Sequence, residues 1–218
     1  MSGTATLDPA AADAARTFRI TRIVLSVAMI AALIFVAGAA FPYFGLGQPQ
    51  AVFPGARRWW LLLHISTGMI ALLSGPYQLW LGLTDRKPKL HRTLGLVYIG
   101  SVLVSSAAAV YLAFNTDNGW VFGAGLLGLA AAWLTTTGLA FVAITKHLYD
   151  QHKEWMIRSY VVTTGFITFR IVFLGLNTAR VGTPIEQLTI SSWICWSDPL
   201  LITEAVLQGR KILAVKSL

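Results

Sequence analysis

The chain has 218 residues, of which 56% are hydrophobic and only 12% are charged. Soluble domains carry about 25% charged residues, so this composition excludes an ordinary water-soluble globule. The net charge of +8 does not indicate nucleic-acid binding, because the 17 Lys and Arg residues lie at the ends of apolar runs. Cys195 is the only cysteine, which argues against an internal disulfide and a cysteine-ligated metal site.

The sequence predicts an all-α polytopic bundle of membrane-spanning helices. Residues 1–19 are Ala-rich and mildly polar, and we expect them to form a flexible tail. Six apolar runs follow, each long enough to cross about 30 Å of hydrocarbon at about 1.5 Å per residue. The predicted spans are residues 20–44, 59–83, 93–114, 121–144, 155–176 and 188–207, and residues 208–218 form a basic tail.

The sixth run is ambiguous because it contains Asp198, Pro199 and Glu204. One interpretation is an interfacial helix that begins at Pro199, since Asp is a favoured N-cap and Pro suits the first helical position. The other is a full span, intact or broken at Asp198 and Pro199. We favour the full span, because the interfacial helix would leave the segment from Trp193 to Trp196 unplaced in the membrane.

Basic residues alternate between the loops, and this pattern predicts the orientation. Thirteen lie in the first tail, the second and fourth loops and the last tail, whereas Arg57, Arg58 and Arg180 lie on the opposite side. The positive-inside rule therefore places both termini in the cytoplasm. Six spans fit this pattern, and five do not.

Polar and small residues recur on single helix faces, which we expect to point inward. In the second span the face comprises His64, Gly68, Ala71, Gly75 and Gln78. In the fifth span it comprises His152, Ser159, Thr163 and Arg170. Gly75 and Pro76 are expected to kink the second span, and the freed backbone groups need Ser74, Gln78 or a neighbouring helix as partners.

Ionisable residues inside the membrane are costly and usually face the bundle interior. We predict a buried polar site formed by His64, Gln78, Arg170 and Asp198. Arg170 and His64 are expected at nearly the same depth, with Arg170 paired to Asp198. Such a pair could be functional, or it could only fix the register of the helices.

A second cluster is predicted at the cytoplasmic ends of the third and fifth spans. His91 and His152 should share a depth there, because these two spans run in the same direction. With His64, they are the candidate ligands of a haem or a metal ion. The basic residues around them form an expected collar that contacts lipid phosphates: Arg86, Lys87, Lys89, Arg92, Lys153 and Arg158.

Segments 63–78, 90–99, 131–137, 152–160 and 193–204 together resemble a family of predicted bacterial multi-pass membrane proteins, domain of unknown function 2306. The resemblance covers roughly residues 59–204. It implies a small helical bundle in the cytoplasmic membrane and no established activity. The motif residues of the family correspond here to His64, His91, His152, Arg92, Arg158 and Arg170, whereas Asp198 stands where the family tends to have an amide.

Three functional hypotheses follow. The first is a bundle that binds or transports a small molecule or a proton at the buried polar site. The second is a redox protein that holds haem b between His91 and His152. The third is a structural or assembly subunit that contacts other membrane subunits as well as the lipid bilayer. Enzymatic activity has little support, because no nucleophile elbow, phosphate-binding glycine loop or metalloprotease helix occurs in the sequence.

Overall fold

A computed structural model of the chain describes residues 9–44, 55–84 and 87–215, and every regular element in these ranges is helical. In chain order the elements are α1 (Pro9–Phe35), the π-helical turn η1 (Val36–Ala40), the 3-10 turn η2 (Phe41–Phe44), α2 (Ala56–Thr84), α3 (Pro88–Phe114), α4 (Trp120–Thr145), α5 (Tyr149–Thr163), α6 (Gly165–Thr178) and α7 (Pro184–Val215). The prediction of an all-α fold is confirmed.

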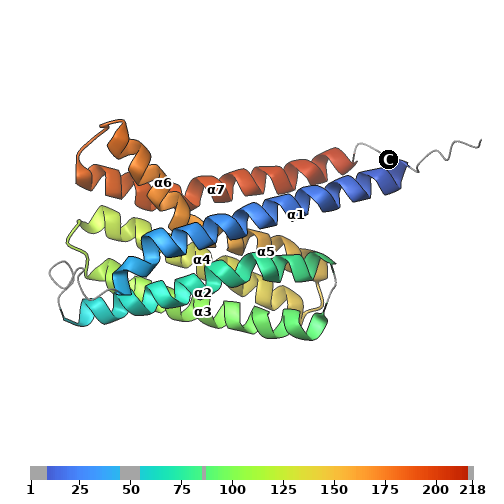
Figure 1. The fold of residues 1–218 in the computed structure, drawn as a ribbon, viewed down its shortest axis with the longest axis horizontal. Coiled ribbons are helices and arrows are strands. Elements are labelled where there is room, and N and C mark those ends of the chain that lie inside the picture. Colours follow the sequence, from blue (N-terminus) through green and yellow to red (C-terminus); the bar gives the residue numbers. More distant parts are fainter. Residues whose placement is uncertain (1–8, 45–54, 85–86, 216–218) are drawn as a thin grey trace, which may run out of the picture.

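Helices α2, α3, α4 and α5 form a four-helix bundle at the centre of the molecule. Consecutive helices pack together, and α5 also contacts α2, so that the ring is closed. Helix α1 lies along α2, whereas α6 and α7 pack against each other and α7 also contacts α4 and α5 (Figure 1). The start of α1 and the end of α7 lie at the same end of the bundle, as an even number of crossings requires (Figure 1).

Five helical stretches of the described chain are long and apolar enough to cross a membrane. They are Ala15–Phe44, Ala56–Thr84, Pro88–Phe114, Trp120–Thr145 and Tyr149–Thr178, and they contain the first five predicted spans. Helix α7 is a sixth long helix of 32 residues that runs along the bundle beside them (Figure 1). The chain is therefore a multi-pass membrane protein.

Helix α7 continues through Pro199 without a break. The interfacial helix that begins at Pro199 is therefore not formed. The helix starts instead at Pro184, where Thr183 donates to the Glu186 carboxylate from its backbone N–H (2.7 Å) and from its hydroxyl (2.9 Å). This contact between the N-cap residue and a Glu three positions later fixes the start of the helix.

The predicted fifth span consists of two helices, α5 and α6, joined at Thr164. The Thr164 hydroxyl donates to the carbonyl of Val161 (2.6 Å), and the Thr163 hydroxyl donates to that of Ser159 (2.9 Å). Hydroxyls that bond back in this way bend helices, and Gly165 follows directly. Helix α6 therefore leans away from the line of α5 and forms a hairpin with α7 (Figure 1).

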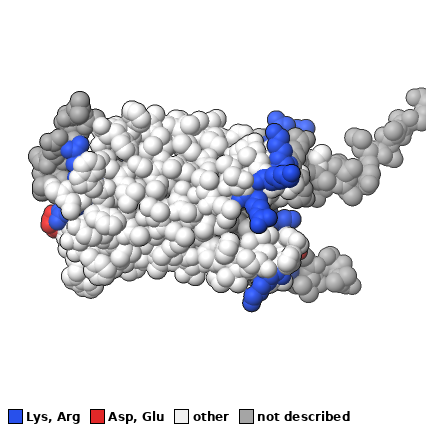
Figure 2. Space-filling model, turned by 90° about the horizontal axis from the view of Figure 1, so that it is seen from below, with Lys and Arg blue, Asp and Glu red and all other residues white. Residues whose placement is uncertain are grey.

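The ends of the molecule carry the charges. In Figure 2 most Lys and Arg atoms lie at the end where α1 begins and α7 ends, and the face between the two ends shows none. Exposed apolar side chains from several helices, among them Leu96, Leu103, Phe141 and Ile202, surround the bundle. A wide apolar belt with charged ends is what a lipid bilayer requires.

Buried hydroxyl groups connect three helices at the centre of the bundle. The Tyr98 hydroxyl on α3 lies 2.8 Å from Ser159 Oγ and 2.7 Å from Thr163 Oγ1 on α5. From α4, Thr137 Oγ1 lies 2.7 Å from Ser159 Oγ, and Trp133 Nε1 donates to Thr163 Oγ1 at 2.9 Å. These side chains are at most 3% exposed, so the network satisfies polar groups that neither water nor lipid can reach.

The predicted inward face of α2 is confirmed, because Gly68, Ala71, Gly75 and Gln78 are all buried. This face carries His64 near one end of the bundle and Gln78 near the other. The 14 positions between them correspond to roughly 21 Å along the helix axis. The two residues therefore belong to separate sites, an outer site at the end with few basic residues and an inner site at the basic end.

Candidate functional site

The inner site is built around His91 and His152, which face each other from α3 and α5. Their ring centroids are 6.5 Å apart and their ring planes are nearly perpendicular, at 89°. Both rings line a cavity of about 450 Å³. The prediction that these two histidines share a depth is therefore correct.

A backbone carbonyl orients the ring of His152, and the side chain of Gln78 contacts His91. His152 Nδ1 lies 2.8 Å from the carbonyl oxygen of Ala140, which can only accept, so Nδ1 carries the proton and Nε2 keeps its lone pair. On the other side, Gln78 Nε2 donates to the backbone carbonyl of His91 at 2.8 Å and lies 3.5 Å from His91 Nε2. The carbonyl oxygen of Gln78 is buried and has no hydrogen-bond partner.

Two glycines make room for the inner site. A side chain at Gly82 would begin 2.9 Å from Cε1 of His91, and one at Gly95 would begin 2.8 Å from Nε2 of Gln78. Real Cβ atoms essentially never come this close to other heavy atoms, so larger residues here would displace the imidazole or the amide.

The predicted basic collar is present only in part. Lys153 lines the inner cavity, and Lys87, Lys89 and Arg92 are exposed at the same end of the bundle. Arg86 lies outside the described residues. Arg158 does not belong to the collar, because it is only 5% exposed and its guanidinium binds Glu204 on α7, with Nε to Oε2 at 2.7 Å and Nη2 to Oε2 at 2.6 Å.

Arg158 is the centre of an ionic network between α5 and α7 that sequence reasoning missed. Glu154 Oε2 lies 3.5 Å from Nη1 of Arg158 and accepts from Lys211 at 2.8 Å. The guanidinium carbon also lies 4.6 Å from the ring centre of Trp155. Glu154 and Arg158 have the four-residue spacing of a helical ion pair, a signal that was available in the sequence.

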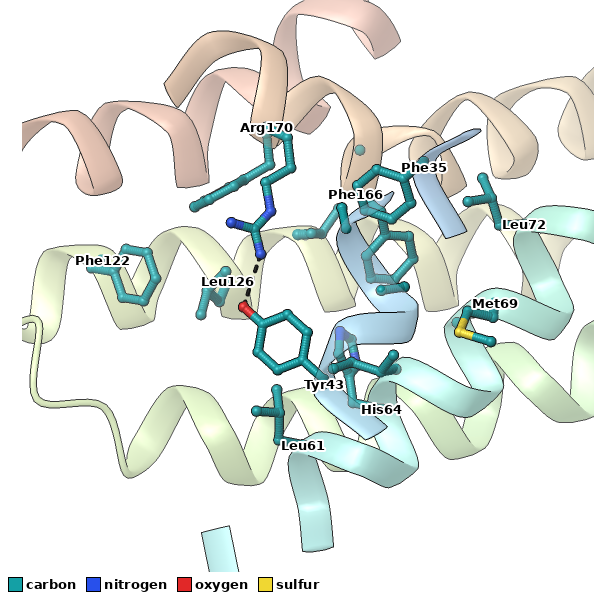
Figure 3. Close-up of a pocket in the computed structure, with 17 residues that line it drawn as sticks. Phe35, Tyr43, Leu61, His64, Met69, Leu72, Phe122, Leu126, Phe166 and Arg170 are labelled. Carbon is teal, nitrogen blue, oxygen red and sulfur yellow. Dashed lines mark hydrogen bonds between the residues drawn. The ribbon is translucent and has the colours of Figure 1, made fainter. Parts of the chain in front are cut away.

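The outer site is an apolar cavity of about 210 Å³ between η1, η2, α2, α4 and α6. His64, Tyr43 and Arg170 are its polar lining residues, and Arg170 donates from Nη2 to the Tyr43 hydroxyl at 3.0 Å (Figure 3). His64 and Arg170 line the same cavity, in agreement with the prediction that they lie at nearly the same depth.

Ser105 on α3 holds His64 in place. His64 Nδ1 lies 3.0 Å from both the carbonyl oxygen and the hydroxyl oxygen of Ser105, and that hydroxyl donates to the backbone carbonyl of His64 at 3.1 Å. The Ser105 oxygens therefore accept from Nδ1–H, and Nε2 of His64 is left with its lone pair. The imidazole also packs against Phe166, with 5.3 Å between the ring centroids.

The predicted ion pair between Arg170 and Asp198 is wrong. Arg170 binds Tyr43 instead, and Asp198 is exposed and accepts a hydrogen bond from the neighbouring Ser197 hydroxyl at 3.1 Å. The reason is depth: α7 begins at Pro184, which puts Asp198 about 21 Å below the outer end of its helix, whereas Arg170 lies about 12 Å below the end of α6. Gln78 belongs to the inner site, so the four predicted residues do not form one buried polar site.

In the described parts of the chain, no group of three or more His, Cys, Asp or Glu residues could hold a metal ion. This finding does not concern a group that needs only two ligands from the protein. His91 and His152 could supply two such ligands.

Comparison with known proteins agrees with the architecture. Neither the search of the curated proteins nor that of the solved structures gives a significant match. One family model, described as predicted membrane protein (DUF2306), matches residues 61–207. This range contains α3 to α6 and most of α2 and α7, together with both histidines of the inner site. The chain therefore belongs to the predicted membrane protein family DUF2306.

Proposed function

We propose that this membrane protein binds haem b at the inner site, with His91 and His152 as the two axial ligands, and acts as a one-electron redox protein. The observation that carries this proposal is the 6.5 Å separation of the two imidazole rings. With metal–nitrogen bonds of about 2 Å and about 1 Å from each ring nitrogen to its ring centre, two imidazoles on opposite sides of one iron would have centres roughly 6 Å apart.

Haem fits this site better than a bare metal ion does. A porphyrin supplies four nitrogen ligands itself, so only two protein ligands are needed, and α3 and α5 offer two. The perpendicular rings are compatible with this arrangement, because each ring plane need only contain its own iron–nitrogen bond. Placing the cofactor between facing helices is a common solution in helical bundles.

The hydrogen bonds around the histidines support ligation. His152 donates from Nδ1 to the Ala140 carbonyl, which leaves Nε2 as a free lone pair and matches the outer-shell contact typical of metal-bound histidine. On the other histidine, Gln78 Nε2 lies 3.5 Å from His91 Nε2, at the limit of a hydrogen bond.

The surroundings suit a large apolar ring with two carboxylates. The cavity of about 450 Å³ lies within the range of roughly 300–1,000 Å³ that is usual for small-molecule sites. Its walls are mainly apolar, with Leu79, Leu81, Met156 and Ile157 among them. Lys153 lies in the lining, and Arg92 is exposed at the same end, so cations are available for the propionate groups.

The concentration of basic residues at one end of the bundle indicates on which side of the membrane this activity would lie. With the basic end in the cytoplasm of a bacterial cell, the inner site lies near the cytoplasmic face of the inner membrane. We prefer haem binding to the hypothesis of transport at a buried polar site, because the four residues predicted for that site do not lie close together: His64, Gln78, Arg170 and Asp198. His64 and Arg170 both line the outer cavity.

An optical spectrum tests the proposal. Protein purified from cells supplied with a haem precursor should show a Soret band and, after reduction with dithionite, a sharp α-band. His91→Ala and His152→Ala should each lose or strongly weaken these bands. His147→Ala is the matched control, since His147 is exposed in the loop before α5 and should not matter. A colourless wild-type protein, or unchanged spectra in both ligand variants, would rule out this assignment.

A further inference from the structure

We propose that the outer cavity binds the ring of a lipid-soluble quinol, with His64 accepting from one hydroxyl and Tyr43 and Arg170 donating to the other oxygen. The inference does not depend on haem binding at the inner site, because it uses a different cavity and different residues. It assigns a ligand to the polar residues of the outer half of the bundle.

The size and the walls of the cavity suit one six-membered ring. A dry apolar cavity of about 150 Å³ accommodates benzene, and the outer cavity has about 210 Å³, which leaves room for ring substituents. Four phenylalanines contribute to its walls, and Figure 3 shows Phe35 and Phe166 close to Met69 and Leu72. Flat apolar rings pack well against such aromatic surfaces.

The polar groups distinguish a quinol from an acyl chain. Since Nδ1 of His64 donates to Ser105, its Nε2 can only accept, and a phenolic hydroxyl can supply that proton. The Tyr43 hydroxyl accepts from Arg170, so its own proton is available to a ligand, as are the remaining N–H groups of the guanidinium. The lining thus offers one acceptor and several donors, whereas an acyl chain would use none of them.

The wall toward the lipid is formed by the end of the first span. There α1 gives way to η1 and η2, which contribute Ala39, Ala40 and Tyr43 to the lining. Of the five apolar spans, the first is the least buried inside the protein. Short π-helical turns often mark functional sites in membrane and soluble helices alike. A ligand dissolved in the bilayer can therefore reach the cavity by displacing a segment that packs weakly.

Equilibrium binding tests the inference. The full chain in phosphatidylcholine nanodiscs is titrated with radiolabelled decylubiquinol under anaerobic conditions, and binding to empty nanodiscs is subtracted. We expect saturable binding of one molecule per chain. Arg170→Ala and His64→Phe should each raise the Kd by about tenfold, the effect of about one lost hydrogen bond to a charged or buried partner. Arg180→Ala, an exposed arginine outside the cavity lining, should leave the Kd unchanged.

A competitor and two further variants distinguish recognition by hydrogen bonds from simple filling of an apolar cavity. Decylbenzene keeps a six-membered aromatic ring and the decyl tail but has no oxygens, so it should not displace the quinol at equal concentration. Tyr43→Phe removes only a hydroxyl, so it keeps the test valid if His64→Phe does not fold. Leu126→Trp should abolish binding by filling the cavity. Binding no greater than to empty nanodiscs, equal displacement by decylbenzene, or an unchanged Kd in the Arg170→Ala and Tyr43→Phe proteins would overturn the inference.

Discussion

The hydroxyl of Tyr160 on α5 donates a hydrogen bond to the carbonyl oxygen of Leu72 on α2, at 3.3 Å. Pro76 has no backbone N–H, so this carbonyl lacks its usual partner four residues later in the helix. Inside a bilayer an unpaired carbonyl is costly, because lipid offers no donor. A side chain from the neighbouring helix thus satisfies the group that the proline leaves unpaired, and it also ties α2 to α5.

Tyr160→Phe should lower the free energy of unfolding by about 0.5–1 kcal/mol, because it leaves the Leu72 carbonyl without a donor. Denaturation by sodium dodecyl sulfate, followed by circular dichroism, measures the change. Tyr149→Phe is the matched control, since Tyr149 is exposed at the start of α5 and should have no effect.

The same mutation made in a Pro76→Ala background checks the cause. Alanine restores the backbone N–H, which can bond to Leu72 within the helix, so Tyr160→Phe should then cost clearly less. An equal cost in both backgrounds would show that the tyrosine stabilises the protein for another reason.

Gly75→Ala should destabilise the protein by about 1–3 kcal/mol, because a Cβ at Gly75 would overlap the ring of Tyr160 and push α2 away from α5. Gly100→Ala is the control in a neighbouring helix. Its Cβ would meet nothing within 4 Å, and replacing Gly in a helix should stabilise by up to about 1 kcal/mol. Opposite signs in the same unfolding assay are the expected result, and equal signs would contradict close packing at Gly75.

The sequence predicted the features that depend on a single helix. The face of α2 from Gly68 to Gln78 follows from the 3.6-residue period. Pro76 alone predicts that a freed backbone group needs another partner, from Ser74, Gln78 or a neighbouring helix, and Tyr160 supplies it. The common depth of His91 and His152 follows from helix direction and rise. None of these predictions required knowledge of how two helices are rotated against each other.

Features that depend on two helices were missed or wrong. Whether Arg158 faces Glu204, 46 positions away, depends on the rotation of α7, and no periodicity within either helix reveals it. Arg170 was assigned to Asp198 by counting from the predicted outer ends of two helices, but α7 begins at Pro184, four residues before the predicted start at 188, so Asp198 lies deeper than that count gave. The bend at Thr164 was also missed. The bend did have a local signal, because Thr163, Thr164 and Gly165 combine two back-bonding hydroxyls with a glycine.

Removing the charge of Glu204 should destabilise the contact between α5 and α7. We expect Glu204→Gln to cost about 1 kcal/mol, a discounted value because the Glu204 side chain is 43% exposed whereas that of Arg158 is only 6% exposed. In a double-mutant cycle with Arg158→Met, the cost of Glu204→Gln should largely disappear. Strict additivity of the two mutations would mean that the pair is not coupled. Lys211→Ala, at the exposed edge of the network, should change little.

Acid should weaken the contact between the α3–α4 loop and the start of α2. Arg57 binds Asp117 there, and its hydrogen bond and positive charge lower the pKa of the Asp117 carboxyl below its ordinary value of 3.8. Because the pKa of Asp117 is lower in the folded protein than in the unfolded one, the ion pair stabilises the fold fully at pH values above the pKa of the unfolded state. This stabilisation is lost as the pH falls through the pKa of the folded state. Between pH 5 and pH 3 the wild type should therefore lose more stability than Asp117→Asn. The difference should shrink in high salt, and parallel curves at low salt would contradict this effect.

Cysteine labelling tests one of the crossings, that of α5 and α6, together with the direction of the bundle. Cys195 is fully buried, so a membrane-impermeant maleimide should label the wild type only after denaturation. In a Cys195→Ala background, Asn177→Cys reports the end of α6 and Lys146→Cys reports the loop between α4 and α5, and both positions are exposed.

Because α5 and α6 together cross the membrane once, the two positions should lie on opposite sides. If the basic end faces the cytoplasm, as its charge predicts, spheroplasts should label Asn177→Cys at once and Lys146→Cys only after lysis. Labelling of both from the same side would show that α5 and α6 do not cross together, and the reverse order would invert the orientation and move the inner histidine site to the opposite face of the membrane.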